Sequence, residues 1–327
     1  MSDWKIYHGD GVPTPDRIRG LPEPPPWRNF NFLSESRAKT FLPPHGVVEV
    51  VNAALYLRRP ILVTGDPGTG KSSLAYAVAH ELDLGEVLFW PINSRSTLID
   101  GLYQYDALAR LRQASIERAR TSGDGQAHQE NLLSEDLGRY IKLGPLGTAF
   151  LARDRPRVVL IDEIDKSDVD LPNDLLHVLE NGDFEIPELT RISEETPEVE
   201  VTVSDPGAGR QRIERGHVRC CMFPFIIITS NRERDLPPAF LRRCLRIDLP
   251  HPNPDELRKI VQRHLGMSDE AKLEELLSKF EKRRQQGMVL ATDQLLNAFY
   301  MLAQGRSMSA KDRDLIEQVL LRELDVR

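Results

Sequence analysis

Cysteine is scarce in this sequence, with three residues among 327: Cys220, Cys221 and Cys244. Two of them are adjacent and none lies in a CxxC spacing, so the sequence contains neither a disulfide framework nor a zinc knuckle. This scarcity excludes the class of small secreted proteins that disulfides stabilise. We expect three reduced thiols, buried as small apolar residues in a cytoplasmic protein.

Long hydrophobic runs are also missing. Apolar stretches such as residues 223–229 are much shorter than the roughly 20 residues of a membrane-spanning helix. No basic segment followed by an apolar one opens the chain, so we expect no membrane insertion and a cytoplasmic location.

A surplus of positive charge is absent too. The formal net charge is −7, which argues against non-specific nucleic-acid binding.

Proline, in contrast, is abundant near the N-terminus. Residues 1–45 contain eight prolines. Because proline restricts φ and donates no backbone hydrogen bond, this composition predicts an extended N-terminal arm rather than a packed element. Trp27 and Phe30 are the expected anchors of this arm.

From Gly46 to Pro250, short apolar segments alternate with helical patterns. This alternation predicts an α/β domain with a mainly parallel sheet that is covered on both faces. Beyond Pro250, leucines recur every three or four residues and predict a small helical lid domain, residues 251–327. The expected strands are 61–64, 86–92, 157–161, 225–230 and 245–249, and the expected lid helices are about 254–265, 269–286, 292–304 and 309–324.

Two stretches interrupt the alternation. Residues 107–143 are rich in charge and contain a glycine-containing break at 122–125, which predicts a helical insertion with a mobile middle. Residues 183–222 contain alternating apolar positions around the turn-forming SDPGAG of residues 204–209, which predicts a β-hairpin.

The segment GDPGTGKS, residues 65–72, has the spacing GxxxxGK[ST] between an apolar strand and a helical pattern. Glycines let backbone N–H groups point at phosphates, the lysine reaches the terminal phosphates, and the serine can ligate Mg²⁺. The segment therefore predicts a nucleotide-binding phosphate loop. Its candidate residues are Gly65, Asp66, Pro67, Gly68, Thr69, Gly70, Lys71, Ser72 and Ser73.

Two other predicted strands end in polar residues that hydrolysis requires. VVLIDEID, residues 158–165, places Asp162 and Glu163 at the carboxyl end of a buried strand, the edge where α/β sheets bind ligands. Asp162 would hold Mg²⁺ through its water shell, and Glu163 would deprotonate the attacking water. FPFIIITSN, residues 223–231, places Asn231 at a similar end, where its amide can bind that water and the terminal phosphate.

These motifs in this order resemble the AAA+ ATPases, and the resemblance covers nearly the whole chain after Gly46. The segments GPLGTAFLA (144–152), IIITSN (226–231) and LPPAFLRRCL (236–245), together with residues 160–189, resemble the MoxR branch. The resemblance implies ATP and Mg²⁺ as cofactors and assembly into a ring, usually a hexamer. It also implies a protein client, often handled together with a partner that carries a von Willebrand A domain, and a hairpin at 183–222 that faces the ring centre or the client.

The same resemblance gives a role to the arginines of residues 236–250. In the family, an arginine shortly before the last strand of the sheet reaches the ATP of the neighbouring subunit. Arg243 has this place and Arg242 is its neighbour, although a solvated helix end would also favour arginine. Such a cation stabilises the charge on the transferred phosphoryl group. We expect its partner in another copy of the chain and not in the chain's own fold.

One departure concerns the lid. The family presents a basic residue at the start of the third lid helix, whereas residues 292–295 contain no lysine or arginine. A second hypothesis therefore stays open: a signalling or defence switch that binds ATP, assembles and hydrolyses slowly. A nucleic-acid translocase would use the arginines of residues 110–120, but their alternation with apolar residues is more typical of an exposed amphipathic helix. We therefore expect no nucleic-acid partner.

Overall fold

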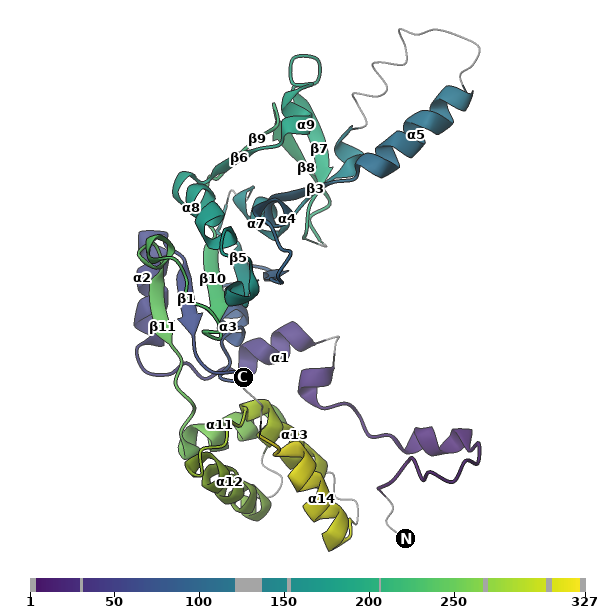
Figure 1. The fold of residues 1–327 in the computed structure, drawn as a ribbon, viewed down its shortest axis with the longest axis vertical. Helices are drawn as coiled ribbons and strands as arrows, with labels where there is room; N and C mark the ends of the chain where they lie inside the picture. The colour runs from purple at the N-terminus through teal and green to yellow at the C-terminus, as the bar shows by residue number, and fades with distance from the viewer. Residues whose placement is uncertain are drawn as a thin grey trace. The chain divides into compact units, whose positions relative to one another are not determined.

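The computed structural model describes residues 4–29, 32–120, 137–151, 154–205, 207–266, 270–303 and 308–323 (Figure 1). Its contacts divide the chain into two compact units. The sheet unit comprises residues 45–64 and 78–248, and the lid unit comprises residues 1–44, 65–77 and 249–327. The division into an arm, an α/β domain and a lid at residues 45 and 250 stays a prediction.

The sheet unit contains a five-stranded sheet in which every neighbouring pair is parallel. Its strand order is β11-β1-β10-β5-β2. Side chains on both faces are buried, as the consecutive and fully enclosed residues Leu160 and Ile161 of β5 show, and this explains why the strands are apolar throughout. The predicted α/β fold is confirmed. The strands are β1 (Ile61–Thr64), β2 (Leu88–Pro91), β5 (Val158–Asp162), β10 (Phe225–Ser230) and β11 (Leu245–Asp248).

The helices of the sheet unit are short, and α8 (Leu171–Asn181) illustrates how they form. Its buried residues Leu171, Leu175 and Val178 recur every three or four positions, and it ends at Gly182, which adopts a φ of 68°. The other helices and 3₁₀ turns are α2 (Val47–Leu57), α4 (Leu98–Leu102), α5 (Ala107–Arg120), η3 (Leu137–Tyr140), α7 (Pro145–Phe150), η4 (Ile164–Lys166), α9 (Pro187–Thr190) and α10 (Pro238–Leu241).

A second sheet, of six strands, joins the two stretches that the sequence treats as separate insertions. Its order is β3-β4-β7-β8-β9-β6. The predicted hairpin is present, since β7 and β8 are antiparallel and pair Val199 with Ile213. The strands are β3 (Tyr103–Tyr105), β4 (Ile141–Leu143), β6 (Asp183–Glu185), β7 (Glu198–Thr202), β8 (Arg210–Glu214) and β9 (His217–Arg219).

The prediction of a purely helical insertion at 107–143 is therefore wrong in part. Residues 107–120 form α5, but β4 pairs with β3 and β7. Buried Ile141 and Leu143 flank exposed Lys142, a period of two that is typical of a strand with one buried face. The predicted mobile middle at 122–125 lies outside the described residues.

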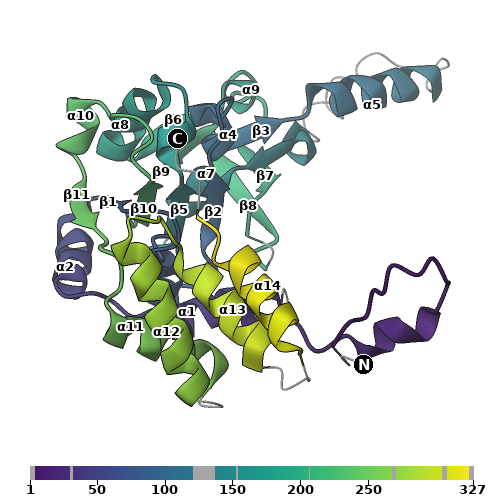
Figure 2. The same ribbon diagram turned by 60° about the horizontal axis from the view of Figure 1, so that its bottom comes forward.

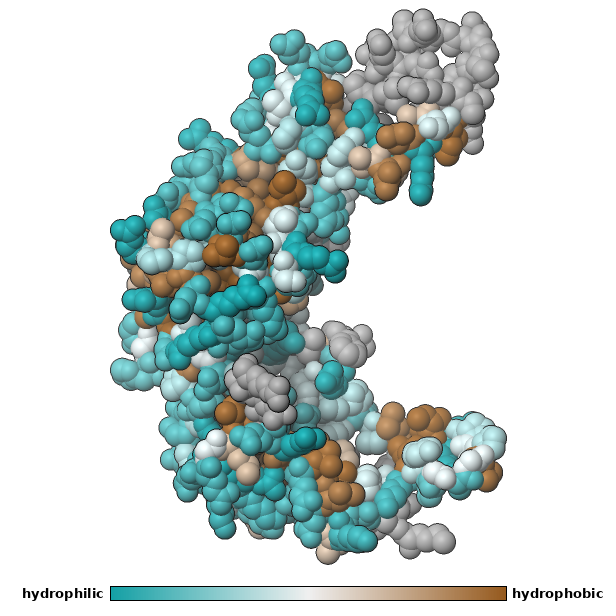
Figure 3. Space-filling model, in the orientation of Figure 1, coloured by the Kyte–Doolittle hydropathy of each residue, from teal (hydrophilic) through white to brown (hydrophobic). Residues whose placement is uncertain are grey.

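The apolar side chains of α5 lie at the surface. Leu108 is 71% exposed and Leu111 is 67% exposed. Figure 3 shows the apolar surface that they form along this helix. The helix is therefore exposed, as predicted. Its apolar residues Leu108 and Leu111 are exposed as well and are not buried against the sheet unit.

The N-terminal segment contains a helix, so the expectation that all of it is extended is wrong in part. A helix, α1 (Leu33–Thr40), follows the 3₁₀ turns η1 (Pro15–Gly20) and η2 (Pro26–Arg28). Proline does not prevent α1 because no proline lies between Pro26 and Pro43.

Trp27 anchors this segment to the helical bundle of the lid unit. Its Nε1 donates to Asn297 Oδ1 at 2.9 Å, and its ring packs edge-on against His264 and Tyr300. The second predicted anchor, Phe30, lies outside the described residues.

The helices after Pro250 lie side by side (Figure 2). They bury their own apolar core, as the leucine spacing predicts. The first one begins with a capping box in which Asn253 Oδ1 accepts the N–H of Glu256 at 2.9 Å and Glu256 Oε2 accepts the N–H of Asn253 at 2.8 Å. The described helices are α11 (Pro254–Leu265), α12 (Glu270–Gln285), α13 (Thr292–Ala303) and α14 (Ala310–Leu320).

The sparse cysteines and apolar runs have structural counterparts. No helix in the described part of the chain is long and apolar enough to cross a membrane. All three cysteines are free, but only Cys244 is buried, and Cys221 is exposed. Burial raises the pKa of the Cys244 thiol to about 12, so this thiol is protonated and unreactive at neutral pH.

The packing of His264 predicts a pH-dependent stability. Burial lowers its pKa from 6.5 to about 4, and its Nδ1 has no hydrogen-bond partner among the described residues. In the unfolded chain this histidine takes up a proton below about pH 6.5. In the folded chain it stays neutral until about pH 4. The free energy of unfolding should therefore fall by up to about 3 kcal/mol over this range as the pH falls.

Urea unfolding at several pH values tests this expectation. His264→Phe should flatten the pH dependence between about pH 6.5 and 4, whereas the control His8→Gln, at an exposed histidine, should leave it unchanged. An equal pH slope in His264→Phe and the wild type would contradict the assignment.

Candidate functional site

At the carboxyl edge of the parallel sheet, β5 and β10 bring Asp162, Glu163 and Asn231 together. Thr229, which is fully buried, links the two strand ends: its Oγ1 donates to Asp162 Oδ1 at 2.7 Å and accepts the backbone N–H of Glu163 at 2.8 Å. Glu163 has a φ of 62°, a left-handed conformation that a residue other than glycine adopts only where its surroundings hold it. The strand ends therefore fix the backbone of the predicted catalytic base.

Two side chains hold the carboxylate of Glu163. Asn231 Nδ2 donates to Oε1 at 3.3 Å, and Lys166 Nζ donates to Oε2 at 2.8 Å. The hydrogen bond to Glu163 raises the pKa of Lys166. Sequence reasoning identified Glu163 and Asn231 but missed Lys166. The sequence does place Lys166 three residues after Glu163. A 3₁₀ turn such as η4 brings side chains with this spacing onto the same side.

Asp165 is a further residue that sequence reasoning missed. It is 2% exposed, and its Oδ2 accepts the backbone N–H groups of Asn231 at 2.8 Å and Glu233 at 2.9 Å. Its Oδ1 has no hydrogen-bond partner among the described residues. A buried carboxylate that accepts two backbone N–H groups fixes the loop that carries Asn231. The sequence offers one sign of this residue, because Asp165 is the third acidic residue of the segment DEID, residues 162–165.

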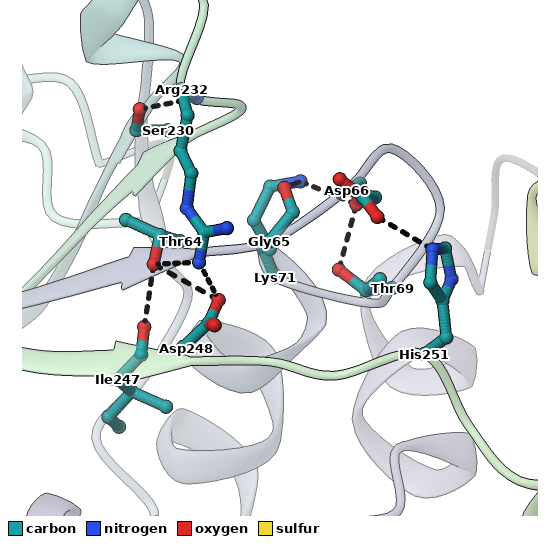
Figure 4. Close-up of polar contacts among 10 residues, drawn as sticks. All are labelled: Thr64, Gly65, Asp66, Thr69, Lys71, Ser230, Arg232, Ile247, Asp248 and His251. Carbon is teal, nitrogen blue, oxygen red and sulfur yellow. Dashed lines mark hydrogen bonds and ion pairs between the residues drawn. The ribbon is translucent and has the colours of Figure 1, made fainter. Parts of the chain in front are cut away.

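Arg232 ties the turn after β10 to two neighbouring strands (Figure 4). Its Nη2 donates to Thr64 Oγ1 at 3.2 Å and pairs with Asp248. Thr64 is the last residue of β1, and Asp248 is the last residue of β11. Arg232 thus joins the ends of three parallel strands at the edge where the chain continues from Thr64 into the GDPGTGKS loop.

In the lid unit, the GDPGTGKS loop curls around the amino group of Lys71 (Figure 4). Lys71 Nζ donates to the carbonyls of Gly65 and Asp66 at 2.8 and 2.9 Å, and the residue is only 7% exposed. Gly68 and Gly70 have φ values of 77° and 88°, which favour glycine. The helix α3 (Ser73–Glu81) begins directly after the loop. This is the strand-loop-helix context that the motif requires.

Three segments of the lid unit contact this loop, and two of them approach it so closely that glycine is needed. A Cβ on Gly65 would lie 2.6 Å from the carbonyl oxygen of Leu249, and one on Gly68 would lie 2.5 Å from the Cβ of Ala291. Phe41 faces Gly70. The start of α13 therefore packs against the phosphate loop, and its first turn carries Asp293 and no basic residue. This agrees with the departure noted in the sequence.

The two candidate finger arginines follow α10 in the sheet unit. Arg243 Nε pairs with Glu180 of α8, and its Nη1 donates to the Ala239 carbonyl at 3.1 Å. The expectation that these cations have no partner in the chain's own fold is therefore wrong for Arg243, because α8 ends beside α10. A pair at a partly exposed position is worth about 0–1 kcal/mol, so it is weak enough to be exchanged. Arg242 is exposed.

Residues 60–244 match the model of the AAA domain of the dynein-related subfamily. The match covers more than half of the 327 residues. The chain belongs to this AAA family. It is therefore a nucleotide-binding protein of the AAA+ ATPase class. The AAA domain includes the phosphate loop, Glu163, Asn231 and Arg243. The comparison with curated proteins gives no match.

The AAA domain contains oxygen ligands of the kind that Mg²⁺ prefers, in the Ser72 hydroxyl and the Asp162 carboxylate. Within the described ranges, no group of three or more His, Cys, Asp or Glu side chains could hold a metal by itself. Mg²⁺ in nucleotide sites is usually held by one or two carboxylates together with substrate phosphates. The donor set fits this arrangement. Ser72 and Asp162 belong to different units, so their shared role stays a prediction.

Proposed function

We propose that this AAA+ ATPase is of the MoxR type and hydrolyses ATP at the subunit interfaces of a hexameric ring, in order to remodel or activate a partner protein. One observation carries the proposal. Asp162, Glu163 and Asn231 meet at the carboxyl edge of a parallel sheet whose strand β1 runs directly into the phosphate loop. Ligands of α/β sheets bind at this edge.

Each residue has a role in this proposal. The backbone of residues 65–70 and the amino group of Lys71 bind the phosphates, and Ser72 and Asp162 hold Mg²⁺. The metal supplies positive charge that offsets charge on the phosphates. Glu163 removes a proton from the attacking water, which Asn231 positions. Arg243 of a neighbouring copy, with Arg242 beside it, meets the transferred phosphoryl group.

A partner protein is part of the proposed function. The β7–β8 hairpin supports this part, since β6, β7, β8 and β9 pair within one sheet. We assign this hairpin to contact with a client, with a von Willebrand A domain protein as the expected co-partner. The Glu163→Gln variant, which is expected to bind ATP without hydrolysing it, should retain the client. The Lys71→Ala variant, which is expected to bind ATP weakly, should not.

A second candidate function is a switch that binds ATP, assembles and hydrolyses slowly. Two observations favour it: Lys166 and Asn231 occupy both carboxylate oxygens of Glu163, and the first turn of α13 has no cation. A turnover well below one per minute, together with ATP-dependent assembly, would favour the switch over the remodelling enzyme.

The phosphate loop is the point at which the proposal is tested first. Lys71→Ala should weaken ATP binding about 10–100-fold, because a hydrogen bond to a charged group contributes about 1.5–3 kcal/mol. Fluorescence of N-methylanthraniloyl-ATP measures the affinity, and light scattering measures the particle mass with and without ATP. Lys259→Ala, at an exposed lysine of α11, is the matched control. A wild type that fails to bind ATP, or binds it as a monomer, would contradict the proposal.

A further inference from the structure

An acidic residue lies inside the loop that is expected to bind an anion. Asp66 is the second residue of GDPGTGKS. Its backbone carbonyl accepts hydrogen bonds from Lys71 Nζ and Thr69 Oγ1, both at 2.9 Å, so the residue is part of the curled loop itself. A carboxylate at this position repels a triphosphate unless a neighbouring cation offsets its charge.

The neighbouring group that can carry this positive charge is a histidine. The Nε2 of His251 lies 2.6 Å from Oδ2 of Asp66 (Figure 4). The side chains are 33% and 54% exposed. Hydrogen bonds between an imidazolium and a carboxylate are charge-assisted and stronger than neutral ones. When His251 is protonated, the pair is neutral overall, and the loop then presents a net positive charge from Lys71.

The backbone places His251 at this position and connects it to the lid helices. The segment that begins at Leu249 passes close to the loop at Gly65, where a Cβ would lie 2.6 Å from the Leu249 carbonyl oxygen. Prolines 250, 252 and 254 then restrict the segment that carries His251. Arg284 of α12 donates to the Pro252 carbonyl at 3.2 Å, and Asn253 caps α11. These contacts connect the segment that carries His251 to α11 and α12.

We propose that His251 is a positioning residue for the nucleotide: its imidazolium offsets the charge of Asp66 and so couples the phosphates in the loop to the hinge of the lid. The inference rests on the proposed binding of ATP to this loop. In this proposal His251, at the hinge, supplies the positive charge that the first turn of α13 lacks. His251 acts through Asp66 and does not itself need to touch the phosphates.

Among the described residues, few charged groups surround His251. They are Asp66, in contact with His251, and Arg284, which contacts Pro252 and pairs with Glu281. Removal of the cation at position 251 should therefore leave Asp66 facing the phosphates without compensation.

Affinity for N-methylanthraniloyl-ATP in the presence of Mg²⁺ tests the proposal. His251→Gln should weaken binding up to about fivefold, because the pair of His251 with Asp66 is partly exposed. In an Asp66→Asn background the same substitution should change affinity by less than about twofold, because the charge that His251 offsets is absent. His251→Lys should bind as the wild type does, because its ammonium group can supply the same positive charge beside Asp66.

Two controls separate this inference from a purely structural effect and from the proposed function. His8→Gln, at an exposed histidine of the same unit, should bind ATP as the wild type does. Equal affinities of His251→Gln and the wild type, or an equal loss in both Asp66 backgrounds, would overturn the role of His251 while leaving ATP binding intact. Loss of binding in the wild type itself would overturn the proposed function instead.

Discussion

Replacing Glu163 by glutamine is expected to lower ATP turnover about 10²–10⁴-fold while ATP binding is retained. Glutamine keeps the shape of glutamate, and the backbone N–H of residue 163 can still donate to Thr229. The amide cannot accept a proton from the attacking water, so only the chemical step is lost. Phosphate release and N-methylanthraniloyl-ATP binding, measured on the same preparation, separate the two effects.

The control for this variant is Glu49→Gln, which changes an exposed carboxylate on α2. It should retain the turnover of the wild type. Lys166→Ala provides a second comparison, because it removes the side chain that pairs with Glu163 but leaves the carboxylate in place. If Glu163→Gln hydrolyses ATP as fast as the wild type, Glu163 is not the base.

Replacing Arg243 by alanine is expected to lower turnover about 10³–10⁵-fold, the size of effect that a cation supplied by another subunit has on phosphoryl transfer. The fold should survive, since the pair of Arg243 with Glu180 is partly exposed and worth about 0–1 kcal/mol. Phosphate release measures the loss, and a thermal unfolding curve verifies that the protein is folded.

Glu180→Gln distinguishes a role in a neighbouring active site from a role within the subunit. If Arg243 acted only by holding Glu180, then Glu180→Gln would lose as much activity as Arg243→Ala. We expect Glu180→Gln to retain turnover, because it frees Arg243 from its partner. Arg242→Ala serves as the adjacent control and should lose less activity than Arg243→Ala.

Mixing the two inactive variants is the decisive experiment for a shared site. A ring that contains both Glu163→Gln and Arg243→Ala subunits has some interfaces with an intact base on one side and an intact arginine on the other. Mixed samples should therefore recover part of the turnover that each variant lacks. No recovery on mixing, together with an active monomeric wild type, would contradict hydrolysis at subunit interfaces.

Local patterns were sufficient for the parallel sheet and the lid helices. The apolar segments around Ile61, Leu160 and Ile227 are buried on both faces, so hydrophobicity alone marks such strands. The leucine spacing of the lid helices reports a buried face in the same direct way. These features depend on residues that are close together in the chain.

Other features were missed because they depend on pairing between distant segments. Strand β4 has only three residues, and its partner β7 begins more than 50 residues later, so no local signal announces the second sheet. The same reason applies to the anchoring of Trp27 by Asn297. Long-range contacts of this kind are specified by the fold as a whole.

The sequence by itself determined the AAA+ class, the phosphate loop and the strand ends that carry Asp162, Glu163 and Asn231, because each is written in a contiguous motif. Only the tertiary structure decided what surrounds them: Lys166 and Asn231 on the Glu163 carboxylate, Asp165 under the loop of Asn231, and His251 against Asp66. A motif specifies which chemical groups are present. Their charge and orientation are set by neighbours that folding brings from elsewhere in the chain.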